Sequence, residues 1–166
     1  MSPITHAILP LALGYKWIPA SLYRPSIPVS SLIALSGALP DLLDPHITLE
    51  ARYNSWSHTV LALGLFGVAV SGVCLYPKFK PFYQVGVLCI FAYALHIFCD
   101  LISGGGRPLL PFSRAIYGRD FWPSWAWGAS DIILLLYLYI FYRWLPLRRR
   151  YNDQRKRSGI TYLNVN

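Results

Sequence analysis

Residues 82–103 read FYQVGVLCIFAYALHIFCDLIS, an apolar run that ends at the breaker Gly104-Gly105-Gly106. A run of this length matches the roughly 20 residues that a helix needs to cross the hydrocarbon of a bilayer. Two ionisable residues of this run, His96 and Asp100, are four positions apart and therefore share one helix face, one turn from each other. Ionisable groups are costly within a span and mark candidate functional positions. The stretch therefore predicts a membrane helix that carries part of a site near its C-terminal end.

Four further apolar segments accompany this one, at residues 3–18, 28–43, 58–76 and 129–145. Breakers close the two longer segments, Pro77 after the third and Pro146 after the last. The first two are short and contain prolines, so each is either a tilted span or a partly buried helix. We therefore expect an all-α, polytopic helical membrane protein with about five membrane segments, in which residues 1–146 form a single domain.

The composition supports the same class of protein. The chain has 166 residues, of which 55% are hydrophobic and 13% are charged, whereas soluble domains average about 25% charged residues. Such a chain could not cover its surface in water, but lipid solvates apolar faces. Three cysteines, Cys74, Cys89 and Cys99, lie inside apolar segments without a CxxC spacing, which favours packing roles over disulfides.

The net charge of +8 is concentrated near the C-terminus, where residues 143–157 hold seven of the fifteen Lys and Arg residues. Because this run directly follows an apolar segment, it indicates a stop-transfer flank or contact with anionic lipid, and no nucleic acid partner is expected. The polar residues 147–166 are predicted to be a disordered, basic cytoplasmic tail.

The positive-inside rule gives the orientation. With the C-terminal tail in the cytoplasm and five spans, eleven basic residues fall inside and four fall outside, and the reverse orientation exchanges these numbers. The inside set adds four residues to the tail: Lys16, Arg24, Lys78 and Lys80. The outside set is Arg52, Arg107, Arg114 and Arg119. We therefore expect a bacterial-type inner-membrane protein with its N-terminus outside.

The segment between the last two spans reads GGGRPLLPFSRAIYGRDFWPSWAW, residues 104–127, with three prolines, four glycines and many aromatic side chains. Trp and Tyr prefer the membrane interface, where the ring and its polar edge are both satisfied. We expect a structured outer loop that lies over the helix ends.

On this topology every histidine and three of the acids lie on the outer side, at helix ends that can be adjacent: His6, Asp41, Asp44, His46, His58, His96 and Asp100. Imidazole with carboxylate, in the absence of thiolate, suits Zn, Mn or Fe in a catalytic site. Taken singly, several have ordinary explanations, since His46 can be solvated at the interface and Asp44 can end a helix before Pro45. The agreement of four separate segments favours one shared site.

In chain order six of these residues, all but His46, lie in THAILPLALG (residues 5–14), LPDLLD (39–44), SWSHT (55–59) and HIFCDLISGGGRPLLP (96–111). This ordered set resembles the YdjM-like family of integral-membrane, metal-dependent hydrolases. The resemblance implies a metal site formed by His6, Asp41, Asp44, His58, His96 and Asp100. The family often shows H-R-x-x-[ST]-H before the histidine matched to His58. Here the chain reads NSWSH (54–58), so Arg52 or His46 is expected to replace a ligand or a phosphate contact.

The function expected from this site is hydrolysis of a phosphoester or phosphoanhydride in a lipid or lipid-linked substrate, with one or two divalent ions, most simply Zn. The strongest ligand candidates are Asp41, His58, His96 and Asp100. Asp44 or His6 is then a further ligand or the general base. Arginine side chains can hold a phosphate in bidentate fashion, and Arg107 and Arg114 of the outer loop are candidates for this, with lipid headgroup contact as the alternative.

Three other functions fit parts of the pattern. A metal-dependent acyl-ester or amide hydrolase needs the same residues. A metal or proton transporter also uses histidines and acids within the membrane, but it needs polar groups through the whole membrane depth. Residues 63–75 and 85–93 contain no acid, basic residue or histidine, which counts against a transport path. A non-catalytic scaffold with a structural metal would bind a partner through the basic tail. The oligomeric state does not follow from the sequence.

Overall fold

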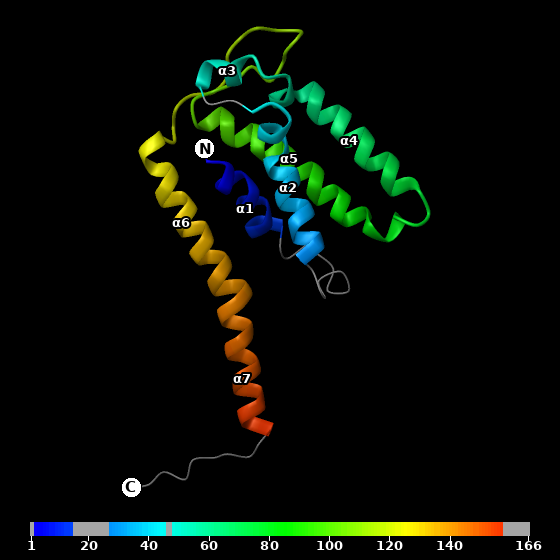
Figure 1. Ribbon diagram of the computed structural model, residues 1–166, viewed down its shortest axis with the longest axis vertical. Helices are drawn as coiled ribbons and strands as arrows, with labels where there is room; N and C mark the ends of the chain where they lie inside the picture. The colour runs from blue at the N-terminus through cyan, green and yellow to red at the C-terminus, as the bar shows by residue number, and fades with distance from the viewer. Residues whose placement is uncertain (1, 15–26, 46–47, 158–166) are drawn as a thin grey trace.

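The structure is a computed structural model that describes residues 2–14, 27–45 and 48–157. His46, Lys16 and Arg24, together with residues 15–18 of the first predicted segment, lie outside these ranges. Within them the fold is helical and contains no strand, only two isolated bridges in the outer loop (Figure 1). The all-α prediction is therefore confirmed.

Five apolar helices match the predicted segments: α1 (Pro3–Gly14), α2 (Ile27–Leu43), α4 (Val60–Leu75), α5 (Tyr83–Ile102) and α6 (Trp127–Leu138). The remaining elements are α3 (Leu49–Tyr53), η2 (Trp56–His58), η3 (Lys80–Phe82), η4 (Ser124–Ala126), η5 (Tyr139–Trp144) and α7 (Leu145–Arg157). Two stretches of the described chain have the length and hydropathy of a membrane span, Lys80–Ile102 and Trp127–Arg148. The other three apolar helices have 12, 17 and 16 residues, so the prediction of five full membrane segments is not confirmed.

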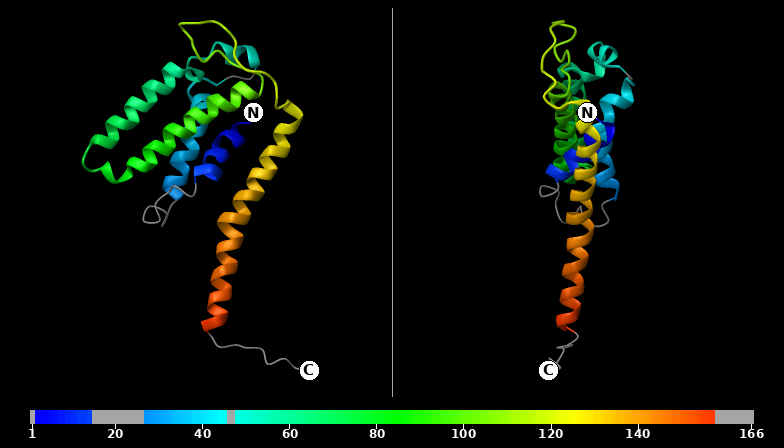
Figure 2. Two further views of the ribbon diagram at one scale, coloured as in Figure 1. Left: turned by 180° about the vertical axis from the view of Figure 1, so that it is seen from behind. Right: turned by 90° about the vertical axis from the view of Figure 1, so that its left-hand side faces the viewer.

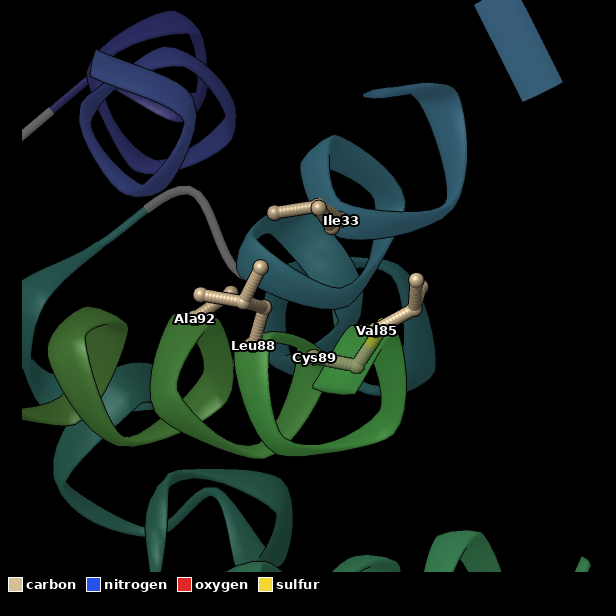
Figure 3. Close-up of a cluster of buried hydrophobic side chains, with 5 residues drawn as sticks. All are labelled: Ile33, Val85, Leu88, Cys89 and Ala92. Atoms are coloured by element: carbon tan, nitrogen blue, oxygen red, sulfur yellow. The ribbon is translucent and has the colours of Figure 1, made fainter. Parts of the chain in front are cut away.

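Helix α5 lies at the centre of the fold, packed against α1, α2 and α4. It runs antiparallel to α4, and the pair crosses α2 obliquely (Figure 1). Figure 3 shows the contact between α2 and α5, where Ile33 packs on Val85, Leu88, Cys89 and Ala92. These side chains are almost fully buried. The apolar faces of α2 and α5 thus form the core, and Cys89 is a packing residue as predicted.

Helices α1 and α2 approach each other closely at Gly37. A side chain there has no room, because a Cβ atom on Gly37 would overlap the carbonyl oxygen of His6. That carbonyl lacks its regular helical partner, since Pro10, four residues later, has no N–H. Glycine at position 37 therefore sets the spacing between the two helices and fixes the depth of His6 in the bundle.

Helix α6 packs against α1 and otherwise presents apolar side chains to its surroundings. The hydroxyl of Thr5 in α1 donates a hydrogen bond to the carboxylate of Asp131 in α6, as does the hydroxyl of Ser2. Asp131 therefore has a structural role: it ties α6 to the start of α1. The faces of α6 that do not contact α1 are apolar and exposed, which is typical of a helix surrounded by lipid.

The helix continues beyond the predicted end at Pro146. The ring of a proline clashes with the carbonyl four residues earlier in a regular α-helix. Here the preceding turn, η5, is a π-helix in which the N–H of Leu145 bonds to the carbonyl of Ile140, and this wider turn accommodates the proline. Helix α7 then runs to Arg157, so the prediction of disorder from residue 147 was wrong as far as Arg157. The guanidinium group of Arg148 lies over the ring of Trp144, one turn earlier, and this contact joins α7 to the π-helical turn before it.

The outer loop, residues 103–123, caps two helices. Its backbone N–H groups at Arg119, Phe121 and Trp122 bond to the last carbonyls of α5, at Leu101 and Ile102. The carbonyl of Pro108 accepts a hydrogen bond from the first N–H of α4, at Val60, over 2.8 Å. Helix ends leave such groups unpaired, so the loop satisfies both ends at once. The expected structured loop over the helix ends is present.

Candidate metal centre

The helix ends that carry the predicted ligands meet at one end of the bundle. The start of α1, the end of α2, the start of α4 and the end of α5 lie together there, under the outer loop, and α7 ends at the opposite side (Figure 2). His6, His58, His96 and Asp100 are each at most 6% exposed, and the side chain of Asp41 is 22% exposed. Five ionisable side chains, far apart in sequence, thus form one cluster.

The imidazole of His96 is held in a defined tautomer. Its Nδ1 atom lies 2.7 Å from the carbonyl oxygen of Gly37. Because a carbonyl only accepts hydrogen bonds, Nδ1 carries the proton and donates it, and Nε2 of the neutral ring presents a lone pair. That lone pair points into the cluster, where Nε2 lies 3.4 Å from Oδ2 of Asp100.

The imidazole of His58 is oriented by two serines. Its Nδ1 atom lies 2.8 Å from Oγ of Ser55 and 3.1 Å from Oγ of Ser57. Ser57 donates its own proton to the carbonyl of Pro40, over 2.8 Å. All these contacts are satisfied together when Nδ1 of His58 donates and the hydroxyl of Ser55 donates to Ser57. Nε2 of His58 then also presents a lone pair to the cluster.

The Nε2 atoms of His58 and His96 lie 3.0 Å apart. With both protons on Nδ1, two lone pairs face each other at hydrogen-bond distance, and no proton lies between them to make the contact favourable. Histidine ligands in metal sites show this arrangement, with one ring nitrogen donating to an oxygen of the protein and the other facing the ion. The donor set therefore fits a cation placed between the two rings.

The spacing of the donor atoms supports the same conclusion. Nε2 of His58 lies 3.2 Å from Oδ1 of Asp41 and 3.3 Å from Oδ2 of Asp100. Nε2 of His96 lies 3.6 Å from the same oxygen of Asp41. Four ligands about 2.0–2.1 Å from a tetrahedral ion are about 3.3 Å from one another. Asp41, His58 and His96 therefore form one group of donor atoms close enough to hold such an ion.

His6 belongs to the same cluster on its other side. Its ring stacks on that of His96 with centroids 3.8 Å apart, and its Nε2 atom lies 3.3 Å from Oδ1 of Asp100. His6, His96 and Asp100 form a second group of donor atoms close enough to hold an ion. Because His96 occurs in both groups, it is the shared centre of the cluster.

Burial also affects the protonation of His58, which precedes α4 and lies outside the two stretches long enough to cross a membrane. Burial lowers the pKa of this imidazole below its ordinary value of 6.5, and the Asp41 carboxylate, which would accept a hydrogen bond from the protonated ring, opposes the effect only in part. His58 is therefore neutral at pH 7, the form that binds a metal.

With this geometry in place, the chain can be compared with known proteins. The family model described as YdjM inner membrane protein matches residues 1–163. The chain belongs to the YdjM inner membrane protein family. The predicted resemblance is therefore confirmed, and the chain is a membrane protein. No curated protein matches it, and neither does any solved structure.

Arg52 has a defined place in this YdjM-family chain. It lies in α3 and is 6% exposed. Its Nη1 atom donates to Oδ1 of Asp100 over 2.9 Å, and Nη2 donates to the carbonyl oxygens of Ser103 and Gly105. Arg52 was predicted as a substrate contact or as the replacement for a missing family residue. In the structure its hydrogen bonds instead orient Asp100 and hold the outer loop over the cluster.

The other predicted residues of the YdjM-family site lie farther out. Asp44 stands one residue beyond the end of α2 and belongs to neither group of converging donors among the described residues. Arg107 donates to the side chain of Asn54 over 2.9 Å, which links the loop to the end of α3. Arg114 is exposed on the loop. His46 falls outside the described ranges.

Sequence reasoning missed the residues that orient the ligands: Gly37, Ser55, Ser57 and Tyr93. Tyr93 donates its hydroxyl to the carbonyl of Ser57 over 2.6 Å and so supports the segment that carries His58. One signal was visible in the sequence, because Tyr93 stands one turn before His96 on the same face of α5. The role of Gly37 depends on a contact between distant helices, which no local pattern shows.

Proposed function

We propose that this chain is a metal-dependent hydrolase that cleaves a phosphoester or phosphoanhydride of a lipid or lipid-linked substrate at the non-cytoplasmic face of the membrane. The observation that carries the proposal is the pair of facing Nε2 atoms of His58 and His96, 3.0 Å apart, with the carboxylates of Asp41 and Asp100 beside them. Buried imidazole and carboxylate without thiolate is a donor set of catalytic Zn, Mn or Fe sites.

When bound, such an ion supplies a Lewis acid that polarises the bond to be cleaved and activates water. The chain itself leaves room beside the cluster, in a void of about 10 Å³ lined by residues that include Arg52, His58 and Asp100. This is close to the space of a single water molecule. His58 and Asp100 stand where they can orient that water, and Arg52 keeps the orientation of Asp100 fixed.

A further group is needed to accept a proton from the attacking water. The two candidates were His6 and Asp44. The geometry favours His6, because its Nε2 atom contacts Asp100 and its ring stacks on His96, whereas Asp44 belongs to neither group of converging donors. His6 is therefore assigned either this role or that of a further ligand, and a site with two ions would use it as a ligand.

The side of the membrane follows from charge. The basic residues of α7 lie at the opposite end of the molecule from the cluster (Figure 2). Because Lys and Arg next to a span favour the cytoplasm, this arrangement supports a cluster at the outer face. Arg107, between the void-lining residues Gly106 and Pro108, supports a phosphate-bearing substrate over a neutral ester, since guanidinium groups bind phosphate in bidentate fashion.

The first test is metal content. We expect near-stoichiometric Zn, Mn or Fe in the purified protein by elemental mass spectrometry, and its loss in His96→Ala. Cys99→Ala is the matched control, because Cys99 is buried on the same helix three residues away but belongs to neither donor group. This variant should keep the metal. A folded wild type that binds none of the three metals when they are supplied would contradict the proposal.

The second test identifies the bond. Vesicles that contain phosphatidic acid should release inorganic phosphate in the presence of the metal-loaded protein and not with His96→Ala. Release of fatty acid without phosphate would replace the phosphoryl assignment with the acyl-ester alternative.

A further inference from the structure

An apolar groove runs along the outer face of α4, beneath the outer loop. It has a volume of about 410 Å³ and is lined by Val60, Leu61, Gly64, Leu65 and Val68 of α4 and by Pro108, Leu109, Leu110 and Phe112 of the loop. This volume lies within the range of roughly 300–1,000 Å³ that small-molecule sites occupy. We refer to this feature as the α4 groove.

The lining of the α4 groove determines what it can hold. None of its nine side chains carries a hydrogen-bonding or charged group. A polar headgroup placed there would lose its hydrogen bonds to water without replacement, which is costly. Several of the apolar side chains are strongly exposed, Val68 at 72% and Phe112 at 83%. The groove therefore suits a hydrocarbon occupant.

The groove is too small to enclose a partner helix. From Val60 to Val68 the axis of α4 rises about 12 Å, at about 1.5 Å per residue. A helix of that length, with its side chains about 10 Å across, would occupy roughly 900 Å³. The α4 groove has less than half of that volume. A single flexible hydrocarbon chain fits both the volume and the apolar lining.

The groove begins at the metal centre. Pro108 lines both the α4 groove and the small void beside His58 and Asp100. The carbonyl of Pro108 also accepts the hydrogen bond of Val60, two residues after His58. A chain lying in the groove would therefore bring the polar end of the same molecule to the cluster.

Gly64 keeps the middle of the groove open. A Cβ atom at this position would meet nothing within 4 Å. Gly64 lies on the same face of α4 as Val60 and Val68, which are one turn before and one turn after it. Any larger side chain here would project into the groove, because helical side chains lean toward the N-terminal end of their helix, here toward Val60.

We propose that the α4 groove binds one hydrocarbon chain of the lipid substrate and so places the substrate's phosphate at the His58–His96 centre. The identity of the substrate's polar end as a phosphate rests on the proposed function. The binding of its hydrocarbon chain rests on the α4 groove alone. A larger apolar cavity, of about 490 Å³, lies between α2, α4 and α5 and is lined by residues that include Val29, Val70 and Val85. None of its lining residues belongs to the metal centre or to the void beside it. Labelling of this cavity therefore serves as the control for labelling of the α4 groove.

The test requires no turnover. The protein is reconstituted in phosphatidylcholine vesicles that contain a phosphatidic acid with a photoreactive diazirine in one acyl chain, and labelled peptides are mapped by mass spectrometry after irradiation. We expect label to concentrate on Leu61, Leu65 and Phe112. Label spread evenly over lipid-facing positions such as Leu135 of α6, or concentrated at the cavity between α2, α4 and α5, would overturn the proposal.

Two leucine variants sharpen the test. Gly64→Leu should lower the labelling of the groove by roughly tenfold, at the low end of the discrimination that one misplaced methylene gives in an apolar pocket. Gly72→Leu is the matched control, because Gly72 lies on α4, also has open space around it and does not line the groove. It should label as wild type does. Equal labelling of Gly64→Leu and Gly72→Leu would overturn the proposal, whether or not Gly64→Leu is as stable as wild type.

Turnover separates this inference from the proposed function. If phosphate release is present, Gly64→Leu should slow it for dipalmitoyl phosphatidic acid and leave dihexanoyl phosphatidic acid little affected. Unchanged release from both lipids would overturn the groove and keep the hydrolase. Label concentrated in the groove of a protein that binds metal but releases no phosphate would support the groove and contradict the hydrolase.

Discussion

The Nε2 atoms of His58 and His96 face each other at 3.0 Å, although each ring has its other nitrogen bonded to an oxygen of the protein. Each tautomer is fixed by a separate part of the chain, that of His96 by α2 and that of His58 by the turn before α4. The lone pairs therefore converge because the backbone directs them, and the arrangement is maintained by the fold.

Arg52 orients a ligand without joining the donor set. Arg52→Met should lower metal affinity by about 10–100-fold, the usual effect of removing a group that positions a ligand, because Asp100 loses its 2.9 Å hydrogen bond. Titration of the metal-free protein with Zn measures this change. Arg114→Met, which changes an exposed arginine on the loop, is the control and should bind as wild type does. Equal affinity in both variants would show that Asp100 does not need Arg52.

Gly37→Ala should destabilise the bundle and weaken metal binding together. The added methyl group overlaps the carbonyl of His6, and overpacking of this kind costs about 1–3 kcal/mol. The shift also moves the acceptor of His96. Thermal unfolding in detergent and metal content measure the two effects. Gly72→Ala adds a methyl group in open space on α4 and should leave both unchanged or raise stability slightly.

Metal occupancy should decline as the pH falls, because protonated histidines do not bind metal. The burial of His58 should move this decline to a lower pH than that of an exposed histidine. The pKa of His58 is lowered in the folded protein, so the ring stays neutral and able to bind metal as the pH passes below 6.5. The unfolded chain takes up its proton near 6.5 and therefore binds more protons, so the metal-free fold loses stability as the pH falls below that value. Metal content after dialysis across this range, with thermal unfolding in parallel, measures both. Release of the metal already above pH 7 would contradict the assignment of His58 as a ligand.

Gly118→Ala should release the outer loop from the end of α5. Gly118 has φ +94°, and a Cβ atom there would overlap the carbonyl of Leu101. We expect faster trypsin cleavage after Arg114 and Arg119 in reconstituted vesicles. Gly128→Ala, in open space on α6, is the control. An unchanged cleavage rate in Gly118→Ala would show that the loop does not depend on this close contact.

Much of the fold could be predicted from sequence because the signals are local. Apolar runs bounded by Pro77 or by Gly104 gave the helices, and the histidines and acids at their outer ends gave the cluster. The spacing of His96 and Asp100 by four residues was sufficient to place both on one face. The length of the apolar helices was predicted less well, because a tilted or partly buried helix needs fewer residues than a full span.

The parts that could not be predicted depend on contacts between distant segments. Arg52 was expected to meet substrate, but its guanidinium turns inward because Asp100 and the loop carbonyls offer partners that are out of water. Asp44 was predicted to join Asp41 in the cluster, yet α2 ends at Leu43 and the following residue leaves the helix. Pro146 was expected to end a helix, but the π-helical turn before it removes the clash.

The donors of the cluster come from four helices that are spread from the start of the chain to the end of α5. During synthesis, His6 and Asp41 enter the membrane long before Asp100 exists, so the centre is completed only when α5 has inserted and packed against α1 and α2. An ion bound there would then cross-link helices that no disulfide joins, and closing such long loops removes more freedom from the unfolded chain than closing short ones. Binding of the metal would then be the last step in the assembly of the helix bundle.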